Sequence, residues 1–125
     1  MTWKSEIFRA FFVALGASET ISNCIYLLKG NGMRLAAKQH QEIPPDLKEN
    51  QLRVKVICML VSGILFLTVG LYSYLTHSFP YPGAIAVMSA FTLYAVTEAA
   101  YYKYWRTICF SCLSILLLAL LLLSR

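Results

Sequence analysis

The chain has 125 residues, of which 58% are hydrophobic and only 14% are charged. Soluble globular domains carry about 25% charged residues, so this composition excludes an ordinary soluble domain and indicates one integral membrane domain over residues 1–125. The formal charge of +5 would suit a nucleic-acid-binding protein. Membrane topology explains the positions of the basic residues, however, and we expect no nucleic-acid partner.

The first apolar segment, residues 10–28, is long enough to cross a bilayer but contains several polar residues. A signal peptide is one competing interpretation, because Lys4 and Arg9 precede the apolar run and Ala14-Leu15-Gly16 loosely resembles a cleavage site. An amphipathic helix in the membrane interface is another. We expect a span, because the large apolar side chains point in too many directions for one narrow interfacial face.

A polar face runs along this first segment. Helical spacing of i, i+3 and i+4 brings small and polar residues together on it: Gly16, Glu19, Ser22, Asn23 and Tyr26. Glu19 would lie about 15 Å below the boundary that Lys29 marks. Ionisable residues at such depth are costly and indicate function. We expect the face to pack on the other spans, on a second copy or on a partner protein.

Residues 29–55 form a polar loop that contains six basic residues: Lys29, Arg34, Lys38, Lys48, Arg53 and Lys55. Short loops rich in Lys and Arg remain in the cytosol, so the loop is predicted to be cytosolic. Within it, residues 33–41 are expected to form a short surface helix. Pro45 is suited to begin a helix that continues into the second span.

Three further segments, residues 56–76, 82–102 and 107–124, each match the roughly 20 apolar residues of a membrane span. The turn at 103–106 is basic and is also predicted to be cytosolic, which places the C-terminus in the lumen or outside the cell. The sequence therefore predicts an all-α, four-helix transmembrane bundle. The alternative is three spans with an N-terminal interfacial helix.

Glu98 is the only charged residue of the third span. It lies close enough to the predicted cytosolic boundary to pair with Lys103 or Arg106, and a structural ion pair is the expected role. A proton-coupled role is the alternative, because desolvation in lipid disfavours a charged carboxylate.

The cysteines Cys24, Cys58, Cys109 and Cys112 fall at similar depth near the predicted cytosolic boundary. The reducing cytosol argues against disulfides, and the isolated positions of Cys24 and Cys58 argue against a metal site. We expect ordinary helix packing, with S-palmitoylation of Cys109 and Cys112 as the main alternative. No metal or cofactor is expected.

The sequence contains no nucleotide-binding fingerprint, no zinc-protease motif and no nucleophile with an evident base. We expect a non-enzymatic accessory subunit, assembly factor or scaffold of a larger membrane complex. The alternative is a small homo-oligomeric, proton-coupled transporter that uses Glu19. The expected partners are the lipid bilayer and a larger membrane protein or a second copy, in the endoplasmic reticulum or plasma membrane.

Overall fold

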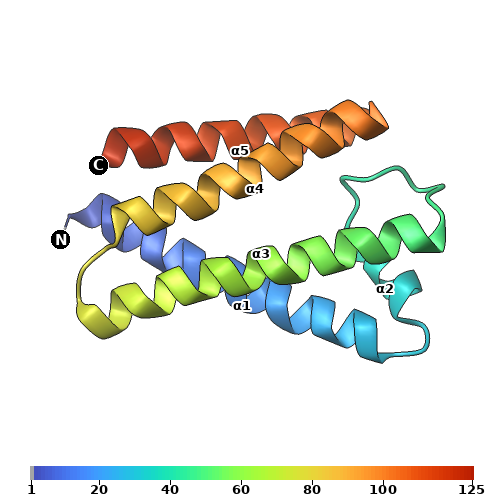
Figure 1. Ribbon diagram of the computed structural model, residues 1–125, viewed down its shortest axis with the longest axis horizontal. Helices are drawn as coiled ribbons and strands as arrows, with labels where there is room; N and C mark the ends of the chain where they lie inside the picture. The colour runs from blue at the N-terminus through green and yellow to red at the C-terminus, as the bar shows by residue number, and fades with distance from the viewer. Residues whose placement is uncertain (1) are drawn as a thin grey trace.

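The computed structural model describes residues 2–125, and its regular structure in that range is entirely helical. Along the chain the helices are α1 Trp3–Leu28, α2 Gly32–Gln39, α3 Glu49–Thr76, α4 Tyr81–Tyr102 and α5 Trp105–Ser124 (Figure 1). All except the short α2 are long and apolar enough to cross a membrane. The predicted four-helix bundle is confirmed, and the chain is a multi-pass integral membrane protein.

The segment between α1 and α3 differs in one respect from the expectation. The short helix expected at residues 33–41 is present as α2, but α3 begins at Glu49 rather than near Pro45. A capping interaction explains this start, because the Gln51 side chain accepts a hydrogen bond from the Lys48 amide at 3.2 Å. The residues before it form a loop that folds back over the bundle.

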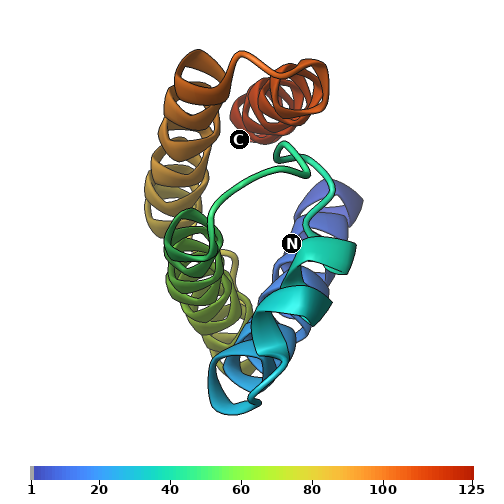
Figure 2. The same cartoon turned by 90° about the vertical axis from the view of Figure 1, so that its right-hand side faces the viewer.

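The four long helices form two pairs. α1 crosses α3 in extensive contact, and α4 lies along α5 (Figure 1). The view along the bundle places the α1–α3 pair and the α4–α5 pair on opposite sides, with α3 next to α4 (Figure 2). α2 lies against α1 and α3 at one end of the bundle, and the loop after it reaches the start of α5.

Glycine permits the close approach of α1 to α3. A Cβ atom added to Gly16 would lie 2.4 Å from the backbone nitrogen of Leu67 and 2.8 Å from the Gly63 carbonyl oxygen. A Cβ on Gly70 would lie 2.6 Å from Cγ2 of Val13. Small residues that allow helix backbones to approach are a principal device of membrane helix packing, because lipid supplies little hydrophobic drive between helices.

Four phenylalanines connect the two pairs through the centre of the bundle. Phe12 of α1 packs edge-on against Phe66 of α3 with a centroid distance of 4.9 Å, and Phe66 contacts Phe91 of α4 at 5.3 Å. Phe110 of α5 completes the series at 5.5 Å from Phe91. Edge-to-face pairs of this kind contribute about 0.5–1.5 kcal/mol each beyond area burial. This line of four phenylalanines therefore joins all four long helices.

We expect Gly16→Ala to lower the Tm of the detergent-solubilised protein, because the added methyl group would overlap the α3 backbone. Overpacking of this kind costs about 1–3 kcal/mol. Gly83→Ala is the matched control, since a Cβ there meets nothing within 4 Å and alanine is the better helix former. A Tm for Gly16→Ala equal to or above that of Gly83→Ala would contradict the close contact.

Candidate functional site

Lys55 is buried at the end of the bundle that α2 covers. Its Nζ lies 2.9 Å from Oε1 of Glu42 in the loop and 2.8 Å from Oε1 of Glu98 on α4. The rings of Tyr94 and Phe110 lie 5.2 and 4.8 Å from the same nitrogen. The ammonium group is thus held by two carboxylates and two aromatic rings, the contacts that a desolvated cation requires.

The partner of Glu98 differs from the two predicted. Lys103 and Arg106 are both exposed, whereas Glu98 faces α3 and pairs with Lys55. The sequence contains a signal for this arrangement: Lys55 shares a helical face with the buried residues Leu52, Val56 and Met59. Lys55 therefore belongs to the core side of α3 and not to the surface of the loop.

Asn23 links α1 to the loop. Its Nδ2 donates to the backbone oxygen of Glu19 at 2.7 Å and to Oε2 of the same residue at 2.8 Å. Oδ1 of Asn23 therefore faces His40, whose Nε2 donates to it at 2.9 Å. The other ring nitrogen, Nδ1, lies 3.6 Å from Oε1 of Glu42. Both ring nitrogens of His40 therefore face side-chain oxygen atoms, one of Asn23 and one of Glu42.

These contacts form one polar network with members from all four long helices and from the loop after α2. Thr107 of α5 donates from its hydroxyl to the backbone oxygen of Glu42, and Tyr94 donates to Glu98. We use the term polar network for Glu19, Asn23, His40, Glu42, Lys55, Tyr94, Glu98 and Thr107. It connects α1, the loop after α2, α3, α4 and α5 through side-chain contacts.

Glu42 shows the strength of the electrostatic coupling. Burial alone disfavours its charged form and raises its pKa. The hydrogen bond from His40 and the charge and hydrogen bond of Lys55 outweigh burial and lower the pKa of Glu42 to about 2. Glu42 is therefore an anion at neutral pH and is a firm partner for the Lys55 ammonium.

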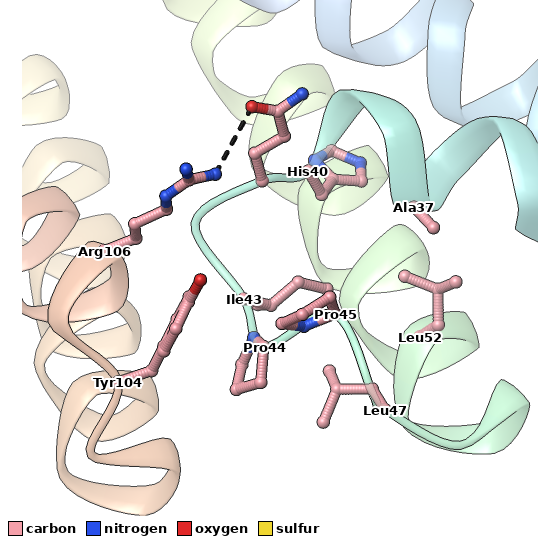
Figure 3. Close-up of a pocket in the computed structure, with 10 residues that line it drawn as sticks. Ala37, His40, Ile43, Pro44, Pro45, Leu47, Leu52, Tyr104 and Arg106 are labelled. Carbon is pink, nitrogen blue, oxygen red and sulfur yellow. Dashed lines mark hydrogen bonds between the residues drawn. The ribbon is translucent and has the colours of Figure 1, made fainter.

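A pocket of about 390 Å³ opens outside the polar network, and we call it the outer pocket. Tyr104 and Arg106 form one side and face Ile43 and Pro44 across it (Figure 3). The Arg106 guanidinium reaches the loop and donates to the Gln41 side chain at 3.5 Å, the dashed contact in Figure 3. The outer pocket is therefore bounded by the loop and by the turn between α4 and α5.

A second space, the inner cavity, lies within the bundle and measures about 360 Å³. Glu19, His40 and Glu42 line it at one end. The rest of its wall is largely apolar: Phe11, Leu15, Met59, Phe66, Met88, Phe91, Phe110, Leu113 and Leu117. Because His40 also lines the outer pocket, its ring stands between the two spaces.

The polar face predicted on the first segment contacts other parts of its own chain. Gly16 and Asn23 are buried, whereas Glu19, Ser22 and Tyr26 are half-buried. The Tyr26 hydroxyl donates to the Gln39 side chain of α2, and Gly16 meets α3. Within the chain, this face therefore contacts α2 and α3.

Sequence reasoning missed His40, Glu42 and Lys55 as members of the site. Each lies in the segment interpreted as a cytosolic loop, where polar residues are ordinarily solvated. The apolar Ile43, which directly follows Glu42 and is buried in the structure, was the available signal that this part of the loop returns to the bundle.

The cysteines do not join the polar network. Cys109 and Cys112 are exposed on α5, and Cys24 and Cys58 are half-buried. Within residues 2–125 no group of three His, Cys, Asp or Glu side chains is arranged to hold a metal ion. In the polar network the Lys55 ammonium occupies the position between the carboxylates where a cation would sit.

Comparison of the chain with protein-family models, with curated proteins and with solved structures gives no significant match. The functional argument therefore rests on the geometry of the polar network and its two adjoining spaces.

Replacing Lys55 by methionine should destabilise the protein by about 3–5 kcal/mol, because the buried Glu98 and the half-buried Glu42 would both lose their cation. Arg53→Met is the matched control, since its ion pair with Glu49 is exposed and contributes at most about 1 kcal/mol. Thermal unfolding in detergent measures both. The double variant Lys55→Met/Glu98→Gln should recover part of the loss, and a similar Tm for both single variants would contradict the pairing.

Acidification should lower the stability of the folded protein, because Glu42 becomes protonated. Its folded pKa lies below the ordinary value of 4.5, so its ionised form stabilises the folded protein above that value. This contribution is lost as the pH falls from about 4.5 toward 2. We expect the Tm of Glu42→Gln to be lower at neutral pH and to decline less on acidification. Glu49→Gln, on the exposed start of α3, should keep the wild-type pH profile, and an unaltered profile in Glu42→Gln would disprove the assignment.

Proposed function

We propose that the protein is a non-catalytic accessory or assembly subunit of a larger membrane complex. It resides in the endoplasmic reticulum or plasma membrane, with the loop between α1 and α3 in the cytosol. One observation carries the proposal: four side chains capable of acid–base chemistry, His40, Glu42, Lys55 and Glu98, are engaged with one another and hold the helices together. A general acid or base must instead reach a substrate proton.

The outer surface of α5 supports the partner interaction. Leucines at alternating spacings of four and three residues form one exposed stripe: Leu113, Leu116, Leu120 and Leu123. This is the spacing of left-handed helix pairs, and many membrane bundles use the same crossing geometry. α5 packs mainly on α4, so the stripe is accessible to a helix of another protein.

The location of Cys109 and Cys112 fits the same surface. Both thiols are exposed on α5, near the proposed cytosolic boundary where S-palmitoylation occurs. An acyl chain on either cysteine would lie beside the leucine stripe and would influence which neighbour α5 meets.

A proton-coupled transporter is the second candidate. The observation that favours it is the position of Glu19 in the wall of the inner cavity, hydrogen-bonded through Asn23 to His40. His40 also borders the outer pocket. A proton that enters from the outer pocket would therefore have a short route of polar groups to Glu19.

Leu116→Trp should reduce several-fold the recovery of a stoichiometric membrane partner with the tagged protein in mild detergent, because a bulky ring would disrupt helix packing. Leu71→Trp on α3 is the matched control, since Leu71 is 46% exposed against 54% for Leu116. Quantitative mass spectrometry compares the two. Equal recovery would exclude the stripe as the contact, and a pure homo-oligomer without a partner would favour the transporter.

A further inference from the structure

We propose that the inner cavity, together with the groove between α1 and α5, binds a single-chain amphiphile whose head group is a cationic amine. The groove has a volume of about 480 Å³. Phe11 and Leu117 line both spaces, so they adjoin along the length of the bundle. The proposed ligand places its amine against Glu19 and Glu42 and its chain along the groove. This site does not rest on the proposed accessory function, although Leu113, Leu120 and Leu123 of the leucine stripe also line it; Leu116 lines neither space, so the two proposals can be tested with different variants.

The polar end of the inner cavity selects for a cation. Among residues 2–125, Glu19 has no basic partner within ion-pair distance, and Asn23 is the only side chain that donates to its carboxylate. Glu42 also lines this cavity. A carboxylate without a counter-ion at the end of an apolar cavity is costly, and an ammonium group relieves that cost.

The charge balance of the surrounding elements points the same way. The carboxylates that face this region are Glu19 from α1, Glu42 from the loop and Glu98 from α4, and the cationic groups are Lys55 from α3 and the ring of His40. The residues of α5 that line the cavity are uncharged. When the three carboxylates are ionised, one negative charge therefore stays uncompensated even with His40 protonated.

The remaining walls select for a hydrocarbon chain. Away from its acidic end the inner cavity is lined mainly by phenylalanine, leucine and methionine. The groove beyond it is lined mainly by apolar side chains, including Trp3, Ile7, Phe8, Leu120 and Leu123, with Lys4 and Ser124 as its polar members. From Glu19 to Trp3, α1 extends about 24 Å at 1.5 Å per residue. An extended chain fits this shape, whereas a compact polar molecule would leave most of it empty.

Anionic amphiphiles of the membrane should bind this site more weakly than amines do. A fatty acid has the same chain but would place a third carboxylate next to Glu19 and Glu42, and like charges at close range are unfavourable in a low dielectric. A long-chain alcohol would fill the groove but would not compensate the negative charge of Glu19. Affinity should therefore follow the order amine, alcohol, carboxylic acid at constant chain length.

Native mass spectrometry of the full chain in a non-ionic detergent provides the test, with hexadecylamine, hexadecanol and hexadecanoic acid as probes. We expect the wild-type protein to retain one hexadecylamine saturably and the other two much more weakly. Glu19→Gln should weaken amine binding about tenfold, and Glu6→Gln, which changes an exposed glutamate outside the cavity, should not. Equal amine binding by Glu19→Gln and wild type, or a preference for hexadecanoic acid, would overturn the proposal.

A second variant, in the apolar wall of the proposed site, tests the proposal even if Glu19→Gln misfolds. Leu117→Trp fills the space shared by the inner cavity and the groove and should abolish retention of hexadecylamine, whereas Leu71→Trp on the outside of α3 should preserve it. Tm and elution volume establish that each variant is folded. Unchanged binding in folded Leu117→Trp would exclude the groove. Recovery of a protein partner is measured separately with Leu116→Trp, so failure of either proposal is recognisable by itself.

Discussion

The single buried ammonium of Lys55 is the constraint on which one end of this bundle depends. It neutralises carboxylates that come from the loop and from α4, and both would be severely destabilised in an apolar setting without it. Because Glu42 must reach Lys55, the loop has to fold back over the bundle. Because Glu98 must reach it too, α4 can adopt only one rotation about its axis. One charge therefore fixes two elements.

The two helix pairs are held by different means, and the difference explains where space remains. Glycine brings α1 and α3 into backbone contact, which leaves no room between them. The line of phenylalanines connects that pair to α4 and α5 through the centre. α1 and α5 have no comparable small-residue contact, so the inner cavity and the groove lie along their junction.

The helical architecture was predictable because apolar runs of about 20 residues have few alternatives to a membrane span. Glu19 and Asn23 were identifiable as a polar face because helical periodicity determines neighbours within one helix. The pairing of Glu98 with Lys55 could not be predicted, because sequence spacing does not specify how separate helices rotate relative to one another. His40 and Glu42 were hidden for a similar reason: loop composition does not reveal that a loop returns to the core.

The order of residues around Lys55 bears on how the protein is made. Glu42 precedes Lys55 in the chain, whereas Glu98 follows it by 43 residues and Thr107 follows later still. During synthesis α3 therefore emerges with one of its two carboxylate partners already present and the other absent. The fold at this end is completed only after α4 and the start of α5 have left the ribosome, so a chain interrupted before α4 would hold its buried lysine in a half-satisfied state.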